Sequence, residues 1–190
     1  ALSCYDLVYF LYNHYLKINS FDDPLRDRFI LSKGHAAAAL YVAMNQAGFI
    51  TSGQLNTFGM IGSLLEEHPS PKLKGIETAS GSLGHGLAVG AGMALGSKIR
   101  NLKNKNIVLM GDGEQNEGTV WEAALFASAK NLDNLIGIVD YNKWQATGRS
   151  NQVLDISPLA KKWESFGWTT LEIDGHDLAE FKEALNSDPV

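Results

Sequence analysis

Two side chains with oxygen ligands stand just beyond two apolar segments of the sequence. Asp112 lies between two glycines directly after residues 106–110, and Asn142 comes just after residues 135–140. Apolar runs of this length are typical of buried parallel strands, and in a right-handed βαβ unit the carboxyl ends of both strands meet at one sheet edge. Carboxylate and amide oxygens suit Mg²⁺, which completes its coordination with water and phosphate oxygens. The sequence therefore predicts a metal-bridged diphosphate site.

The strength of this pattern lies in its combination. Gly-Asp-Gly alone is a common turn, and taken by itself a turn would be the better interpretation. Here it joins a strand to a helix that opens with Glu117-Gly118, and Asn142 follows the next strand. A helix at 83–99 adds five glycines, and each costs roughly 0.8–1 kcal/mol relative to Ala in a helix interior. So many glycines in one helix indicate that a ligand approaches the helix backbone closely. The alternative is that the glycines only allow tight packing against a neighbouring element.

The remaining elements follow from hydrophobic periodicity, turn residues and caps. We expect helices at 2–17, 36–46, 83–99, 119–130, 158–166 and 178–185, strands at 27–31, 106–110, 135–140 and 169–173, and a long loop at 59–81. Ser3 is the expected N-cap of the first helix. From residue 106 onward strands and helices alternate, which predicts an α/β fold: a doubly wound, mostly parallel sheet with helices on both faces.

Composition limits the classes of function. The chain has 190 residues, 45% of them hydrophobic, with a formal net charge of −5, which fits one globular domain or slightly more. An acidic balance without a basic stripe argues against nucleic acid or anionic membrane as a partner. The single cysteine, Cys4, excludes an internal disulfide and agrees with a reducing, cytoplasmic location. The longest weakly polar stretch, 84–96, is too short to span a bilayer.

Four stretches of the chain resemble one family. Residues 108–148 (VLMGDGEQNEGTVWEAALFASAKNLDNLIGIVDYNKWQATG) resemble the thiamine-diphosphate motif of transketolases. Residues 27–40 (DRFILSKGHAAAAL), 67–69 (EHP) and 78–93 (TASGSLGHGLAVGAGM) agree with the same family in the same order. The chain is most similar to the N-terminal subunit of the split bacterial kind. The resemblance implies that residues 1–190 form a single diphosphate- and Mg-binding domain of the thiamine-diphosphate-binding fold, incomplete at both ends.

The resemblance also implies roles for individual residues. Asp112, Asn142 and the backbone carbonyl of Trp144 would hold Mg²⁺, for which Ca²⁺ or Mn²⁺ can substitute, and the metal would bridge the cofactor diphosphate. Gly81 and Leu83 would pass beside the aminopyrimidine and thiazolium rings of thiamine diphosphate. The full set of expected cofactor-binding residues is His35, Gly81, Leu83, His85, Gly111, Asp112, Gly113, Glu114 and Asn142.

Three residues are expected to take part in catalysis. His35 matches the family histidine near the diphosphate and the substrate, and His68 matches the one that contacts the donor hydroxyl. Glu117 matches the acid that points into the subunit interface and couples two active sites. The alternative for Glu117 is an ordinary first-turn glutamate favoured by the helix dipole. His85 stands where many relatives carry glutamine, so a hydrogen bond near the cofactor is expected.

The implied activity is that of a transketolase, which moves a two-carbon ketol unit from a ketose phosphate donor to an aldose acceptor. No segment resembles the pyrimidine-binding domain of the family. We therefore expect a second subunit to supply that domain, in a homo- or hetero-oligomer, with a heterotetramer as the expected assembly. The sequence does not identify the donor and acceptor sugars.

Other functions remain open beside this one. A 1-deoxyxylulose-5-phosphate synthase or a 2-oxoacid dehydrogenase component would keep the cofactor, but Glu67-His68-Pro69 favours transketolase. A non-catalytic scaffold subunit related to transketolases is a third alternative. A nucleotide-binding module of the Rossmann type is not expected, because the sequence has neither a G-x-G-x-x-G turn nor a P-loop lysine motif.

Overall fold

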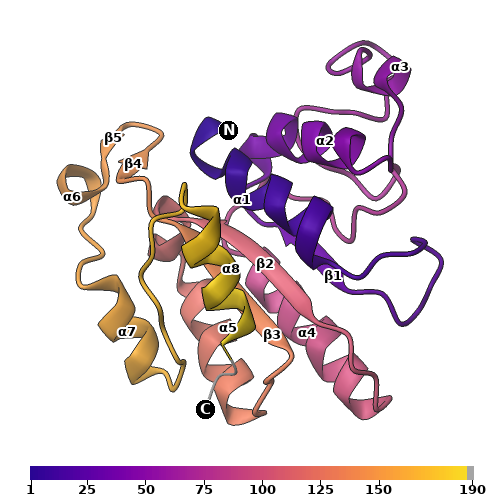
Figure 1. Cartoon of the computed structure of the whole chain (residues 1–190). Helices are drawn as coiled ribbons and strands as arrows, with labels where there is room; N and C mark the ends of the chain where they lie inside the picture. The colour runs from indigo at the N-terminus through magenta and orange to yellow at the C-terminus, as the bar shows by residue number, and fades with distance from the viewer. Residues whose placement is uncertain (188–190) are drawn as a thin grey trace.

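A three-stranded parallel sheet lies at the centre of the chain. The structure, a computed structural model, describes residues 1–187. Strands β1 (Arg28–Leu31), β2 (Asn106–Gly111) and β3 (Leu135–Asp140) are hydrogen-bonded in that order (Figure 1). The register places Leu31 opposite Leu109 and Gly111 opposite Asp140. The carboxyl ends of the three strands therefore meet at one edge of the sheet, as the sequence predicts.

Helices account for most of the remaining regular structure. The α-helices are α1 (Tyr5–Phe10), α2 (Ala37–Gln46), α3 (Ser52–Leu55), α4 (Gly86–Ile99), α5 (Gly118–Ala129), α6 (Ser150–Val153), α7 (Leu159–Ser165) and α8 (Leu178–Asn186). A 3₁₀ turn at Leu2–Cys4 precedes α1 and a π turn at Leu11–Tyr15 continues it, so the expected first helix is present in three pieces. A short antiparallel hairpin, β4 (Trp144–Gln145) and β5 (Gly148–Arg149), follows β3.

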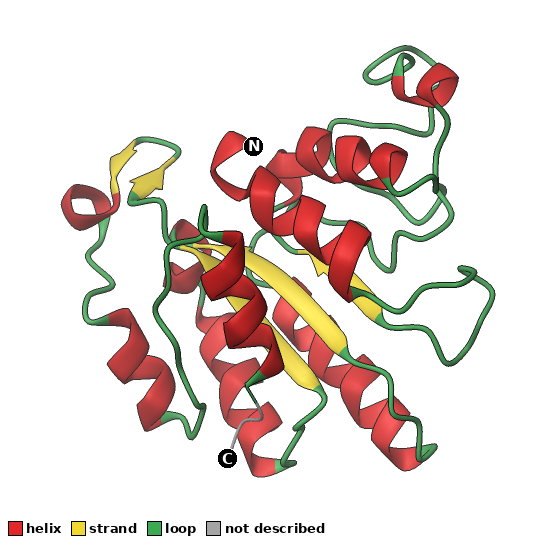
Figure 2. Ribbon diagram, viewed as in Figure 1, coloured by secondary structure: helices red, strands yellow, loops and turns green. Residues whose placement is uncertain are grey.

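The helices cover both faces of the sheet (Figure 2). On one face Phe29, Leu31, Ile107 and Leu109 pack against α1, α2 and α8. On the other face Ile30, Val108 and Met110 pack against α4, α5 and α7. Successive strand residues alternate between the two clusters because side chains on a strand point alternately to opposite faces. The prediction of a doubly wound α/β fold is confirmed.

The glycines of α4 divide into two groups. An ideal Cβ on Gly90 would lie 2.5 Å from Val108 Cγ2, and one on Gly86 would collide with the Ser32 side chain. These glycines let the helix lie directly against the sheet. Gly92 and Gly96 face outward, and an added Cβ there would meet no described atom within 4 Å. Tight packing within the chain therefore explains only part of the glycine content.

One expected helix start and one expected strand are wrong. The helix expected from residue 83 begins at Gly86, because Gly84 has φ +87° and donates its N–H to Glu114 instead of entering the helix. The strand expected at 169–173 is not paired with any strand in the described part of the chain. Its apolar residues Leu171 and Ile173 are exposed, so the alternating pattern there does not mark a buried strand.

Two further local predictions have different outcomes. Ser3 does not cap the first helix, because its hydroxyl donates to Asp140 Oδ2 at 2.7 Å. The long loop is present: among the described residues, none from 56 to 85 lies in a helix or strand. This loop carries His68 and Gly81, two of the residues expected at the site.

Candidate functional site

A buried carboxylate joins the strand ends that carry the predicted site. Glu114, only 1% exposed, accepts the N–H groups of Gly84 at 2.8 Å and Gly111 at 3.2 Å, and the hydroxyl of Ser32. Ser32 Oγ in turn accepts the N–H of Gly86 at 3.1 Å. The Glu114 carboxylate therefore links the ends of β1 and β2 to the start of α4. Both of its oxygens accept hydrogen bonds from this chain itself, although the sequence placed Glu114 among the cofactor-binding residues.

A buried charge pair links the end of β1 to β3. Lys33 Nζ lies 2.5 Å from Asp140 Oδ2, and the two side chains are 2% and 6% exposed. Burial raises the pKa of Asp140, but hydrogen bonds from Lys33, Ser3 and Asn142 together with the charge of Lys33 hold that pKa below its ordinary value. Sequence reasoning missed this pair. The available signal was a charged residue at the end of each of two apolar strands.

Asp112 and Asn142, two of the three expected metal-binding residues, follow β2 and β3 at the same edge, and the third, Trp144, begins β4. Asp112 is buried, and its carboxylate accepts the Gly113 N–H at 2.8 Å and the Ser150 hydroxyl at 2.7 Å. Asn142 Oδ1 accepts the N–H of Trp144 at 2.9 Å. One carboxylate, one amide oxygen and one backbone carbonyl form a hard-oxygen set with few protein ligands, which fits Mg²⁺. No group of three or more His, Cys, Asp or Glu residues that could hold a metal occurs within residues 1–187.

The β4–β5 hairpin covers the glycine turn after β2. An ideal Cβ on Gly113 would lie 3.1 Å from Gln145 Cγ, so the Gln145 side chain packs directly on this turn. Asn116 donates to Gln145 Oε1 at 3.2 Å, whereas Gln145 Nε2 is buried and has no hydrogen-bond partner among the described residues. A buried donor without an acceptor costs free energy. An anion at the turn would supply the acceptor, which fits a diphosphate.

The histidines lie on the outer side of this edge. His35 is exposed, and burial of part of its ring lowers its pKa, with the charges of Lys33 and His68 acting in the same direction. His68 is also exposed, and an ideal Cβ on Gly81 would lie 3.7 Å from its Cδ2. His85 is exposed at the position before α4. The structure thus brings His35 and His68 to one face.

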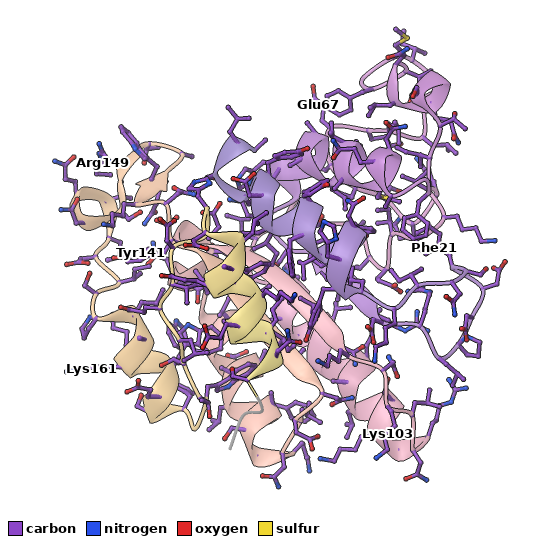
Figure 3. The ribbon with its side chains drawn as sticks, viewed as in Figure 1. Phe21, Glu67, Lys103, Tyr141, Arg149 and Lys161 are labelled. Carbon is purple, nitrogen blue, oxygen red and sulfur yellow. The ribbon has the colours of Figure 1, made fainter. Side chains whose placement is uncertain are left out.

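The other expected residues lie nearby. Leu83 is half-buried, and Glu117 is exposed at the start of α5. The Cβ of Glu117 would lie 2.7 Å from an ideal Cβ on Gly84, so Glu117 packs beside the turn into α4. Figure 3 shows Arg149 on the hairpin at the upper left and Glu67 on the long loop at the top. The guanidinium of Arg149 stacks 4.1 Å from the centre of the Trp144 ring.

The comparisons with known proteins identify one family. The family model described as the transketolase, thiamine diphosphate binding domain matches residues 1–188. One subunit of the apulose-4-phosphate transketolase of Phocaeicola vulgatus is 39% identical over 188 residues, covering 98% of this chain and 67% of the relative. The 6-deoxy-6-sulfo-D-fructose transketolase subunit SqwG of a Clostridium species is 39% identical, covering 97% of this chain and 68% of the relative.

Longer transketolases match over the same region. The human transketolase is 38% identical over 186 residues, which are 96% of this chain but 30% of that protein. The solved transketolase of Campylobacter jejuni superposes with a TM-score of 0.85 at 30% identity, covering 96% of this chain and 30% of that one. The chain therefore spans about two thirds of the two subunit relatives and less than a third of the longer proteins. Within the described residues, no helix is both long enough and apolar enough to cross a membrane.

Proposed function

The chain belongs to the transketolase family, and we propose that it is the diphosphate-binding half of a transketolase made of two kinds of subunit. The observation that carries the proposal is the meeting of Asp112 and Asn142 at one sheet edge, in a chain that matches the family from residue 1 to 188. The two subunit relatives that match almost the whole chain support the two-subunit form. We propose a single domain over residues 1–190.

The cofactor site is proposed at the carboxyl edge of the sheet. Asp112, Asn142 and the carbonyl of Trp144 would hold Mg²⁺, and Gly113 would lie against the diphosphate. The remaining proposed cofactor contacts are His35, Gly81, Leu83, His85, Gly111 and Glu114. When bound, thiamine diphosphate supplies the nucleophilic carbon that ketol transfer requires. The chain's own residues would bind and orient it, because their positions are set by the strands and by the buried charges beneath them.

The outer histidines are proposed to contact the sugar substrate. The lowered pKa of His35 favours its neutral ring, which can both donate and accept a hydrogen bond. A neutral imidazole suits a sugar hydroxyl, which also donates and accepts. His68 lies on the same face and would contact the donor hydroxyl. Both rings are exposed, so a substrate can reach them without a rearrangement of the core.

The partner subunit is proposed to carry the pyrimidine-binding domain. The names of the two relatives describe one subunit each, which implies a partner in those proteins. Glu117 lies exposed beside the turn into α4, and we propose that it faces the subunit interface. A cytoplasmic heterotetramer is the proposed assembly.

The proposed substrates are a ketose phosphate donor and an aldose acceptor. The names of the two relatives give different sugars, an apulose phosphate and a sulfonated fructose. The family resemblance therefore supports the class of substrate but does not identify one sugar. A pyruvate-using enzyme with the same cofactor is the second candidate. Glu67-His68-Pro69 favours transketolase, and an assay of the purified assembly with ketose phosphates against pyruvate separates the two.

The first test measures cofactor binding by the assembly with Asp112→Ala. We expect loss of Mg²⁺-dependent thiamine diphosphate binding in calorimetry, with an unchanged circular dichroism spectrum, because the variant removes the only carboxylate of the proposed metal set. Asp133→Ala is the control, since Asp133 lies before β3, at the opposite edge of the sheet, with 80% of its side chain exposed. Unchanged affinity in Asp112→Ala would refute the metal assignment.

A second test separates substrate from cofactor contact. His68→Ala should reduce turnover with ketose donors more than it weakens thiamine diphosphate binding, because the proposed contact of His68 is to the donor. Equal loss in both measurements would instead place His68 at the cofactor. Native mass spectrometry of the same assembly then checks for a second polypeptide and for about one cofactor per active site.

A further inference from the structure

The loop between α3 and α4 holds His68 in place without any helix or strand of its own. Tyr41 donates its hydroxyl to the carbonyl of Glu66 at 2.9 Å, and two side chains of the loop itself, Leu65 and Leu73, are buried. These contacts fix the beginning and the middle of the loop. The segment 77–81, which ends at Gly81, needs a separate attachment because it contains no buried apolar side chain.

A buried ion cluster provides that attachment. Glu77 Oε2 accepts a hydrogen bond from Arg28 Nη1 at 2.9 Å, and Glu77 Oε1 accepts one from Arg26 Nη1. The side chains of Glu77, Arg26 and Arg28 are 6%, 8% and 25% exposed. Arg28 is the first residue of β1, so the loop is tied directly to the sheet. We refer to Arg26, Arg28 and Glu77 as the Glu77 anchor.

The anchor is itself rigidly held. Arg26 donates to the carbonyls of Phe21 at 3.0 Å and Asp27 at 3.1 Å, and its guanidinium lies over the Phe21 ring at 5.6 Å. The Phe21 ring, labelled in Figure 3, also packs so closely on Gly75 that an ideal Cβ there would collide with it. Gly75 has φ +97°, which favours glycine. The loop therefore lies flat against residues 21–28 just before Glu77.

From Glu77 the chain runs directly between the two proposed substrate histidines. The N–H of Ser80 donates to the carbonyl of Pro69 at 3.3 Å, next to His68. Gly81 packs against the His68 ring. On the other side, an ideal Cβ on Gly34 would collide with the carbonyl group of Ser80. Segment 77–81 thus touches His68 directly and the turn that carries His35.

We propose that Glu77 is a positioning residue for substrate binding, acting through segment 77–81 on the two histidines. It rests on the proposed function, because it assigns the donor sugar to the space that His35 and His68 face. Glu77 itself is buried away from that space and touches no substrate. Each oxygen of the Glu77 carboxylate accepts a hydrogen bond from a different arginine, so the position of the segment is fixed at two points. A single apolar contact has no such directional preference.

The loop contains a matched control. Lys72 Nζ lies 2.9 Å from Glu66 Oε1, and these side chains are 67% and 43% exposed. Exposed ion pairs contribute little, because both charges are well solvated when apart. Glu66 is two residues from His68, closer along the chain than Glu77. A general effect of charge in this loop would therefore appear in both pairs, whereas positioning by the anchor would appear only in Glu77 and its arginines.

The test compares Glu77→Gln, Arg28→Lys and Lys72→Met in the assembly with its partner subunit. We expect Glu77→Gln to raise the donor KM or lower kcat/KM by about tenfold or more, because a displacement of about 1 Å in a reacting group has effects of that size. Thiamine diphosphate affinity should fall less than kcat/KM does, because Gly81 and His35 are only two of the proposed cofactor contacts, whereas the proposed metal ligands Asp112 and Asn142 follow β2 and β3. Arg28→Lys keeps one charge and should show a smaller loss, and Lys72→Met should match the wild type.

A second measurement does not depend on activity. Amide hydrogen exchange of residues 77–81 should become faster in Glu77→Gln and stay unchanged in Lys72→Met, even if the assembly transfers no ketol unit. If exchange becomes faster in Glu77→Gln but the wild-type assembly has no transketolase activity, the proposed function is rejected and the structural role of the Glu77 anchor is kept. The proposal is overturned if Glu77→Gln and Arg28→Lys keep the wild-type donor KM and kcat/KM, or if exchange is unchanged. It is also overturned if cofactor affinity falls as much as kcat/KM.

Discussion

The carboxyl edge of the sheet has an inner layer and an outer layer of polar residues, which differ in burial and bonding. The inner layer contains Lys33, Glu114 and Asp140, all less than 7% exposed and all hydrogen-bonded within the chain. The outer layer contains His35, His68 and Glu117, which are all exposed. Folding alone determines the position of the inner layer, whereas the outer layer is available to a ligand or a partner.

The two layers respond differently to substitution because they are solvated differently. A charge in the inner layer has lost its water, so removing its partner leaves an uncompensated charge in a medium of low polarity. A charge in the outer layer keeps its water and loses little when a neighbour is removed. Changes in the inner layer should therefore appear as loss of stability, and changes in the outer layer as loss of binding or activity.

The largest expected effect is that of Lys33→Met. The variant leaves Asp140 buried without its cation, and breaking a buried pair in this way costs about 3–5 kcal/mol. Urea denaturation followed by circular dichroism measures the change, with Lys72→Met as the exposed control. The double variant Lys33→Met/Asp140→Leu should recover part of the lost stability, because neither charge remains. A Lys33→Met variant as stable as the control would contradict the division into two layers.

A smaller effect is expected for Glu114→Gln. The amide keeps one acceptor oxygen but loses the charge that strengthens the bonds from Gly84 and Gly111, and such bonds contribute about 1–3 kcal/mol. The outer-layer counterpart is Glu117→Gln, whose side chain is exposed, and its cost should stay within about 0.5 kcal/mol. Thermal unfolding of both variants checks the difference. If Glu117→Gln were the more destabilising of the two, burial would not be the property that separates the layers.

Sequence patterns predicted the strand ends, and the family resemblance singled out His35 and His68, but neither revealed the contacts of the inner layer. Asp112 and Asn142 could be placed because apolar strands reveal their own ends, and parallel pairing brings those ends together. The pairing of Lys33 with Asp140 joins residues 107 positions apart, and no local pattern encodes which distant charge a buried lysine meets. The bonds of Glu114 to Ser32 and Gly84 are long-range in the same way, so the sequence did not reveal them.

The wrong strand and the wrong helix start have a similar origin. Both were expected from local sequence features, and a partly exposed segment such as 169–173 can show a strand-like pattern without a neighbouring strand. The turn at Gly84 is set by a hydrogen bond to Glu114, 30 residues away, and this long-range contact overrides the local preference.

The two sides of α4 extend the comparison between inner and outer positions to the backbone. Gly90→Ala would place a Cβ 2.5 Å from Val108 Cγ2, and overpacking of this kind costs about 1–3 kcal/mol. Gly92→Ala meets no described atom within 4 Å, so it should stabilise the helix by about 0.5–1 kcal/mol. Thermal unfolding of this chain without its partner measures both. If both variants were more stable than the wild type, the sheet would have moved to accommodate the added methyl group at Gly90. If both were less stable, Gly92 would be constrained in a way that its open surroundings do not show.

The smallest expected effect concerns two histidines whose pKa values shift in opposite directions. Burial and the charge of Lys33 lower the pKa of His35, whereas a hydrogen bond to Asp6, with Oδ2 2.7 Å from Nδ1, raises the pKa of exposed His176. In an NMR titration His35 should therefore lose its proton below the ordinary value of about 6.5 and His176 above it. Asp6→Asn should lower the pKa of His176 and leave that of His35 unchanged.

These shifts have opposite consequences for stability. The unfolded chain binds a proton at His35 more readily than the folded chain does, so this residue lowers stability as the pH falls below about 6.5. His176 contributes stability at low pH, which is lost as the pH rises through its raised pKa. A comparison of pH profiles for the wild type, His35→Gln and His176→Gln separates the two. If both histidines titrated at the ordinary value, the charge of Lys33 would not reach the outer layer, and the two layers would be electrostatically independent.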